Sequence, residues 1–218
     1  LLMVLLVWAS RGSTDLVPLR LMALVGAGWW LLALLWLRFF HFASDHETWA
    51  RVFKLAAGTL AVVPAWCALG LIHSSQPNGH IWLFVALAIV WAADSGAYFA
   101  GRHFGGRWFA GRKLAPRISP NKTLEGLLGG LAAGMLVAAA GALLAGAGMA
   151  QLPGVLVVAI FTVLFSVVGD LFESLLKRHV GAKDSGDVIP GHGGVLDRID
   201  GVLAALPIFV LGKEVFGF

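Results

Sequence analysis

The sequence has a single cysteine, Cys67, and charged residues make up only 13% of its 218 positions. One cysteine excludes an internal disulfide. The scarcity of charge accompanies 59% hydrophobic residues and nine tryptophans, which excludes an ordinary soluble domain. Such a composition is typical of a polytopic membrane protein.

Several other features are missing. No tandem repeat or low-complexity linker divides the chain, and its apolar runs do not alternate with polar residues as in a β-barrel. No basic stretch precedes the opening run, so we interpret it as the end of a truncated spanning helix and not as a signal peptide. Since a spanning helix needs roughly 20 apolar residues, the sequence predicts an all-α polytopic membrane fold with about seven spans. These are Leu1–Ala9, Leu16–Leu37, Val52–Ile72, Ile81–Gly101, Leu124–Gly148, Leu152–Gly169 and Ile199–Val215.

The basic residues are sorted along the chain. Thirteen of the sixteen lysines and arginines lie in Arg38–Lys54, Arg102–Lys122 and Lys177–Arg198. With the predicted spans, these three segments emerge on one face, and the connections on the other face carry no lysine or arginine. Cations are retained on the cytoplasmic side, so we expect that face to be cytoplasmic. Attraction to anionic lipid head groups is the simplest role for the excess charge.

Acidic residues also gather near this face, although a carboxylate at membrane depth costs a few kcal/mol. They are Asp94, Asp170, Glu173, Asp197 and Asp200. Single acids could form interfacial ion pairs, Glu173 with Lys177 or Asp197 with Arg198. The whole set at one face instead favours a functional site in a polar cavity that opens to the cytoplasm.

The loop between these acids, "GAKDSGDVIPGHGG", has five glycines, which permit close backbone approach to a ligand. Cations flank or lie in it: Lys177, Arg178, Lys183 and Arg198. No Walker A motif occurs, but glycines, cations and aspartates together indicate a site for polyphosphate and Mg²⁺. Upstream, Ser119-Pro120 predicts a helix start that leaves Lys122 in an anion-binding first turn. A basic loop touching lipid head groups is the alternative there. The acidic and histidine-rich stretch His41–Glu47 we interpret as a solvated loop and not a metal site.

The stretch Ser174–Asp200 resembles the signature of the phosphatidate cytidylyltransferases (CDP-diacylglycerol synthases). Its matching positions are Ser174, Lys177, Arg178, Lys183, Asp184, Gly186, Pro190, His192, Gly193, Gly194, Asp197, Arg198 and Asp200. The segments "WAADSGAYFAGRHFG" and "ISPNKTLEG" also look like family segments, so the resemblance extends from Trp91 to the end of the sequence. Residues 1–90 match only as membrane helices, and 91–218 would form the catalytic region, with cytoplasmic loops 102–123 and 177–198.

The resemblance implies transfer of CMP from CTP to phosphatidic acid, giving CDP-diacylglycerol and pyrophosphate, in a bacterial inner membrane. It also implies a requirement for Mg²⁺. Our hypothesis is that Asp170, Asp197 and Asp200 hold one or two metal ions, with a monovalent second cation left open. Lys177 would join these three in catalysis. Substrate would be bound by Asp94, Lys122, Ser174, Arg178, Lys183, Asp184, His192, Gly193, Gly194 and Arg198. No nucleic acid partner is expected, and a homodimer is left open. A lipid kinase using CTP or ATP is the main alternative, and a cation-coupled transporter is a weaker one.

Overall fold

The computed structural model describes residues 3, 16–45, 47–109, 111–182, 184–186 and 193–218. Within these residues the chain forms six long helices, a short 3₁₀ helix and one β-hairpin. The long helices are α2 (Val17–Trp36), α3 (Thr48–Ser74), α4 (Gly79–Phe104), α5 (Leu124–Leu144), α6 (Leu152–His179) and α7 (Leu196–Phe216); η1 is Met149–Gln151, and the hairpin strands are β1 (Lys113–Ala115) and β2 (Ser119–Thr123). Six of the predicted helices are therefore present, with ends displaced by a few residues. The opening run lies outside the described residues apart from Met3.

Among the residues that the structure describes, five helical segments are long and apolar enough to cross a membrane: α2, α3, α4, α5 and the stretch Met149–His179. The outer surface of α2 carries large apolar side chains. Leu32 and Leu35, for example, are 60% and 59% exposed. Such side chains have no reason to face water, but lipid tails accommodate them. The chain is therefore a helical membrane protein, and the full count of seven spans remains a prediction.

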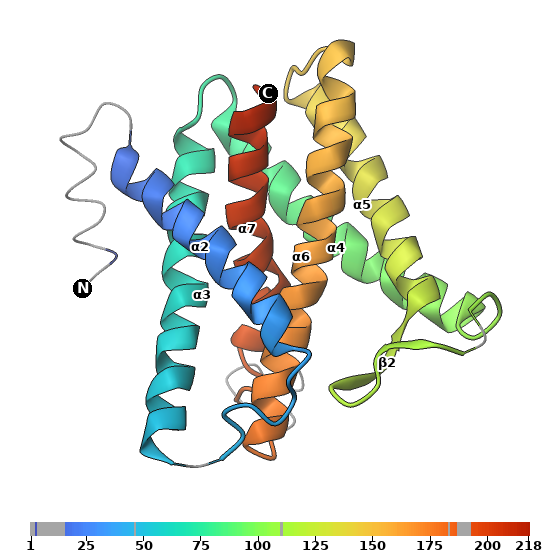
Figure 1. Cartoon of the computed structure of the whole chain (residues 1–218). Helices are drawn as coiled ribbons and strands as arrows, with labels where there is room; N and C mark the ends of the chain where they lie inside the picture. Colours follow the sequence, from blue (N-terminus) through green and yellow to red (C-terminus); the bar gives the residue numbers. More distant parts are fainter. Residues whose placement is uncertain (1–2, 4–15, 46, 110, 183, 187–192) are drawn as a thin grey trace.

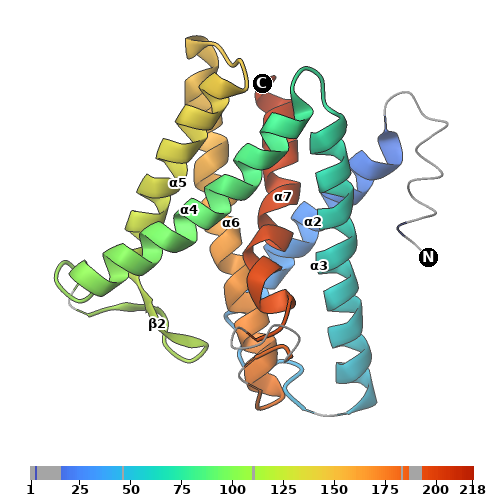
Figure 2. The ribbon, with the colours of Figure 1, turned by 180° about the vertical axis from the view of Figure 1, so that it is seen from behind.

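Helix α7 lies in the middle of the bundle, in contact with α2, α3 and α6 (Figures 1 and 2). Every residue from Gly201 to Pro207 is buried. Its close approach to α6 depends on Gly169, where a Cβ would collide with the backbone carbonyl oxygen of Asp200. This contact places the acidic turn of α6 directly beside the acidic start of α7.

Helices α4 and α5 pack through small residues. The buried positions of α5 recur every fourth residue: Gly126, Gly130, Gly134, Ala138 and Ala142. A Cβ at Gly96 of α4 would collide with the Ala133 side chain of α5. A Cβ at Gly129 of α5 would collide with the Ala100 side chain of α4. Small residues let helix backbones approach closely where lipid supplies no hydrophobic driving force. The last part of α4 is thereby fixed against the start of α5.

The described residues of the three cation-rich segments lie at one end of the bundle, where α2, α4 and α6 end (Figures 1 and 2). The connections α3–α4 and α5–α6 lie at the opposite end with the C-terminus. At that opposite end Arg20 Nε is 2.9 Å from Glu214 Oε1, and Lys213 lies over the Trp82 ring. The sorting of cations read from the sequence is thus reproduced in space.

The expected helix start at Ser119-Pro120 is wrong. Residues Ser119–Thr123 form strand β2, which pairs antiparallel with β1. Helix α5 begins instead at Leu124, because the Thr123 side chain accepts a hydrogen bond from the Gly126 N–H at 3.0 Å. This is the usual geometry of an N-cap threonine. Lys122 therefore projects from a strand and not from the first turn of a helix.

Candidate active site

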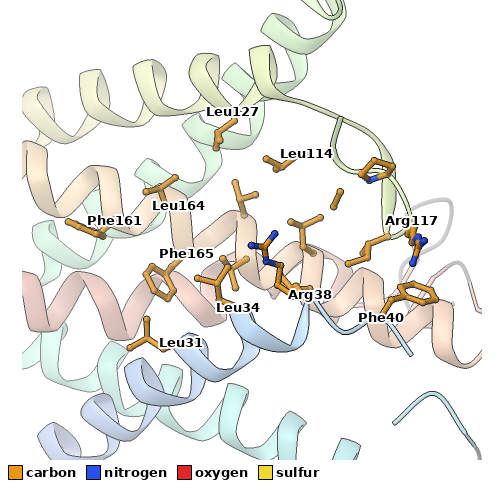
Figure 3. Close-up of a pocket in the computed structure, with 17 residues that line it drawn as sticks. Leu31, Leu34, Arg38, Phe40, Leu114, Arg117, Leu127, Phe161, Leu164 and Phe165 are labelled. Carbon is orange, nitrogen blue, oxygen red and sulfur yellow. The ribbon is translucent and has the colours of Figure 1, made fainter. Parts of the chain in front are cut away.

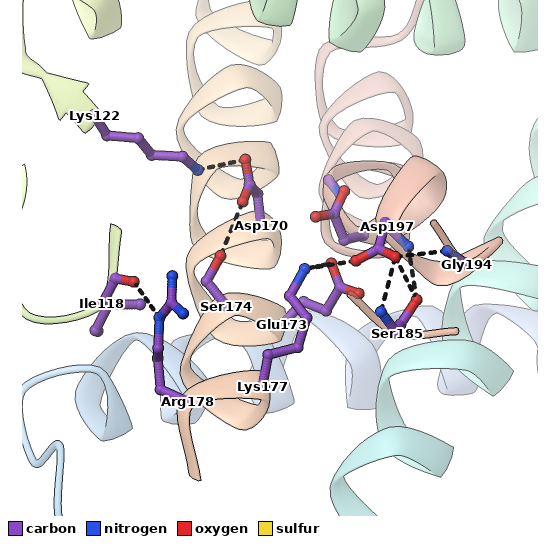
Figure 4. A network of polar contacts seen from close by, with 12 residues as sticks. Ile118, Lys122, Asp170, Glu173, Ser174, Lys177, Arg178, Ser185, Gly194 and Asp197 are labelled. Carbon is purple, nitrogen blue, oxygen red and sulfur yellow. Dashed lines mark hydrogen bonds and ion pairs between the residues drawn. The ribbon is translucent and has the colours of Figure 1, made fainter. Parts of the chain in front are cut away.

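A polar cavity of about 730 Å³ opens between α4, the hairpin, the start of α5 and α6. Among the residues that line it are Asp94, Arg102, Asn121, Lys122 and Asp170. Lys122 from β2 forms an ion pair with Asp170 from α6. The Ser174 hydroxyl, one turn further along α6, lies 3.4 Å from Asp170 Oδ1. Three side chains selected from separate motifs in the sequence therefore meet here (Figure 4).

Two more aspartates belong to the same region. Asp94, on the cavity wall, interacts electrostatically with Asp170, Asp200 and Lys122. Asp200, at the start of α7, interacts with Asp170 and Lys122 and accepts a 2.7 Å hydrogen bond from the Gly201 N–H. Helices α4, α6 and α7 thus each contribute an acid to one electrostatic cluster. This agrees with the placement of Asp94 in the cavity wall that the sequence suggested.

Asp197 lies in a separate network beside this cluster (Figure 4). Its Oδ1 accepts a 2.6 Å hydrogen bond from Lys177 Nζ. Its Oδ2 accepts three more, from the Ser185 N–H at 2.9 Å, the Ser185 hydroxyl at 2.8 Å and the Gly194 N–H at 2.8 Å. The carboxylate therefore joins the end of α6, the loop after it and the start of α7.

These donors determine the charge of Asp197. Burial alone would raise the pKa of its carboxyl group, but the hydrogen bonds from Lys177, Ser185 and Gly194 outweigh that effect. They hold the pKa of Asp197 well below its ordinary range. The side chain is consequently ionised at any physiological pH, and its charge is compensated by Lys177.

Glycine geometry explains the close fit of this loop. Gly193 has φ of 79°, in the left-handed region that favours glycine, and a Cβ there would contact Asp197 Oδ2. At Gly194 a Cβ would collide with the Ser185 hydroxyl. The sequence predicted that these glycines let the backbone approach a ligand; at these two positions the backbone approaches the Asp197 carboxylate and the Ser185 side chain.

Glu173 was noted in the sequence as an acid but was not included among the expected site residues. It is only 5% exposed, and Lys177 Nζ lies 3.4 Å from its Oε2. Within the described part of the chain neither of its side-chain oxygens accepts a hydrogen bond, and the Asp200 carboxyl group lies next to it. Its helical spacing from Lys177 was the available signal, and this ion pair was the alternative that the sequence left open for Glu173.

Glu125 was missed by sequence reasoning. It is 1% exposed, and its Oε1 accepts hydrogen bonds from the N–H groups of Gly106, Trp108 and Phe109 at 2.9–3.3 Å. It thereby fastens the loop after α4 to the start of α5, next to the cavity. The signal that could have found it is an acid in the first turn of a helix, two residues after a threonine that can cap that helix.

The remaining predicted residues have varied places. Arg178 Nε lies 3.4 Å from the Ile118 carbonyl oxygen and connects α6 to the hairpin. Asp184 and Arg198 are exposed around the Asp197 network. Lys183 and His192, like His46 of the His41–Glu47 stretch, lie outside the described residues.

Comparison with known proteins gives a consistent result. A family model described as "Cytidylyltransferase family" matches residues 1–216. The phosphatidate cytidylyltransferase of Haemophilus influenzae is 38% identical over 201 residues, 88% of this chain and 67% of that protein. The corresponding protein of Pseudomonas aeruginosa is 43% identical over 190 residues, 87% of this chain and 66% of that protein. That of Brucella suis is 44% identical over 164 residues, 74% of this chain and 57% of that protein.

The chain spans between 57% and 67% of the length of these curated relatives. Its match to the family model nevertheless runs through all six long helices and both polar networks. The resemblance inferred from Ser174–Asp200 is thereby confirmed, and this chain belongs to the cytidylyltransferase family.

Proposed function

We propose that the chain transfers CMP from CTP to phosphatidic acid, releasing pyrophosphate and forming CDP-diacylglycerol. The observation that carries this proposal is the polar cavity in which Lys122 meets Asp94 and Asp170 at the cation-rich end of a membrane bundle. A soluble nucleotide and a lipid head group can meet only at such an interface. The names of the relatives support the same reaction.

The chemistry needs positioning more than proton transfer. An oxygen of the lipid phosphate attacks the α-phosphorus of CTP, and the bond to the departing pyrophosphate breaks in line with it. The attacking phosphate is already ionised at neutral pH. Lys122 supplies fixed positive charge within the cavity, and Lys177, Arg178 and Arg198 supply more from the adjoining parts of α6 and α7. Such groups act by stabilising charge that develops in the transition state.

We further propose that the acidic cluster binds Mg²⁺ together with substrate. Among the described residues no three His, Cys, Asp or Glu side chains form a ready metal cage. Carboxylate oxygens do suit Mg²⁺, which usually binds through one or two carboxylates and substrate phosphates. Asp170 and Asp200 are the ligands we assign, because both oxygens of Asp197 already accept hydrogen bonds, from Lys177, Ser185 and Gly194. The bound ion would neutralise phosphate oxygens and stabilise the leaving pyrophosphate.

CTP labelled at different phosphates tests the reaction. Purified protein in lipid vesicles with phosphatidic acid and Mg²⁺ should transfer label from the α position into lipid. Label at the γ position should leave as pyrophosphate. The Asp170→Asn protein serves as the control for label carried over without catalysis. Lipid labelled from the γ position would contradict the proposal and indicate a kinase.

We also propose that the cation-rich end faces the cytoplasm of a bacterial inner membrane, because basic loops are retained there. Arg107→Cys at that end and Met149→Cys at the other, each in a Cys67→Ala background, should react from opposite sides of sealed vesicles. Both new cysteines are exposed, and neither lines the polar cavity. Reaction of both from the same side would contradict the arrangement of spans between them.

A further inference from the structure

A second cavity, of about 810 Å³, lies between α2, α6 and the hairpin (Figure 3). We call it the lipid-facing groove. Its walls are almost entirely apolar and include Leu31 and Leu34 of α2 and Phe161, Leu164 and Phe165 of α6. Leu31, Leu34 and Phe161 are also exposed at the surface of the bundle, so the groove is open toward the lipid. Apolar walls of this kind favour hydrocarbon over water as the occupant.

The depth of the groove matches one leaflet. Its lining on α6 runs from Phe161 to Leu171, a span of eleven residues that rises about 15 Å along the helix. Half of a hydrocarbon core of about 30 Å is the same length. The lining on α2 and the residues just after it runs in the same direction. It extends from Leu31, in the second half of α2, to Arg38 at the cation-rich end. A single acyl chain lying along the bundle would therefore fit the groove from mid-bilayer to interface.

Two arginines, Arg38 and Arg117, line the interfacial end of the groove. In Figure 3 the Arg38 side chain points toward the hairpin that carries Arg117 and Leu114. No ion pair involving either guanidinium occurs among the residues that the structure describes. Guanidinium groups bind phosphate oxygens through paired hydrogen bonds. The groove thus combines an apolar slot with a phosphate-binding mouth.

The groove shares a wall with the polar cavity. Leu114 of the hairpin, Leu127 of α5 and Val167 of α6 line both spaces. Asp170, with its partner Lys122, lies one helical turn beyond Val167 on α6. A phosphate held at the mouth of the groove would therefore be close to the cluster of acids and lysines in the polar cavity.

From these observations we propose that the lipid-facing groove binds one acyl chain of the substrate lipid, with its phosphate at Arg38 and Arg117. The nucleotide would occupy the polar cavity on the other side of the shared wall. This assignment rests on the proposed phosphatidic acid substrate and adds the residues that select it. The groove would recognise an acyl chain attached to a phosphate that carries net negative charge. A zwitterionic bilayer lipid also has acyl chains and a phosphate, but its head group has no net charge.

Two pairs of variants test the groove by kinetics. Arg38→Gln with Arg117→Gln should raise KM for phosphatidic acid about tenfold, since charged hydrogen bonds to phosphate are lost. KM for CTP should change little. Arg51→Gln, an exposed arginine at the same end that does not line the groove, is the matched control. Leu34→Trp should raise KM for a long-chain lipid more than for a dioctanoyl lipid. Leu35→Trp, at an exposed position of the same helix that does not line the groove, should not.

A photoreactive phosphatidic acid with a diazirine in its acyl chain provides a readout without turnover. In nanodiscs lacking CTP it should label α2 between residues 31 and 38 or α6 between residues 161 and 171. Unlabelled phosphatidic acid should compete, and phosphatidylcholine should not. Equal competition by both lipids, or an unchanged KM in the groove variants, would overturn the assignment. Labelling of the groove by a protein that transfers no CMP would instead retain the groove and reject the proposed reaction.

Discussion

Asp170→Asn should lower CMP transfer roughly a thousandfold while leaving the stability of the folded protein nearly unchanged. Asparagine keeps the size of the side chain and removes the negative charge that contacts Lys122 and faces Asp94 and Asp200. If Asp170 binds Mg²⁺ together with substrate, about 4 kcal/mol of transition-state stabilisation is lost, which is a thousandfold in rate. The stability of the folded protein should change little because two effects offset each other. The ion pair with Lys122 is lost, but the repulsion from the Asp94 and Asp200 carboxylates is lost as well.

The alternative for Asp170 is a simple ion pair, and it predicts a different result. The side chains of Lys122 and Asp170 are 24% and 37% exposed, and pairs as exposed as these contribute about 1 kcal/mol or less. The matched control is Glu214→Gln, which removes an exposed ion pair at the opposite end of the bundle. Rates measured against Mg²⁺ concentration decide the question. Near-normal activity in Asp170→Asn, with unchanged Mg²⁺ dependence, would remove this residue from the mechanism.

The helices could be predicted well from the sequence because each is an uninterrupted apolar run of sufficient length. The long continuation of α6 beyond the apolar span was also predictable, since no glycine or proline occurs between Asp170 and Arg178. By contrast, the start of α5 was misassigned. Ser119-Pro120 carries a strong local signal for a helix start, but the backbone pairing of the hairpin overrides it.

The site was predictable as a set of residues but not as an arrangement. The motifs around Asp94, Lys122 and Asp170 identified side chains that do converge in one cavity. Nothing in the sequence showed that Asp197 would pair with Lys177, twenty residues earlier, because that contact depends on how α7 packs against Gly169. The role of Glu125 likewise depends on a loop that is fixed only by the packing of α4 against α5.

Asp197→Asn should reduce stability and activity together, in contrast to Asp170→Asn. The carboxylate accepts four hydrogen bonds, one from Lys177 and three from Ser185 and Gly194. An asparagine can satisfy only one side, because its amide group would face donors on the other side whichever way it is turned. A buried donor left without an acceptor costs about 1–3 kcal/mol, and the cost is greater for the Lys177 ammonium. The loop should then detach from the start of α7, where Asp200 lies.

The loss of stability in Asp197→Asn should depend on pH if the ionised Asp197 carboxylate stabilises the folded protein. The pKa of Asp197 is held below its ordinary value in the folded protein. Its ionised form therefore contributes stability above the unfolded pKa of about 3.9, and this contribution is lost as the pH falls through the lower, folded value. Thermal unfolding of the wild type and Asp197→Asn should differ by a constant amount above about pH 5, and the difference should shrink in more acidic buffer.

A smaller change in the same network provides an internal control for this last prediction. Ser185→Ala removes the hydroxyl hydrogen bond to Asp197 but keeps the backbone N–H, so it should produce the same loss at a reduced size. Activity should fall in proportion to the loss of stability across the two variants, because both act by releasing the loop. A large loss of activity in Asp197→Asn with an unchanged unfolding temperature would contradict this role. It would indicate that the carboxylate exchanges Lys177 for a metal ion during the reaction.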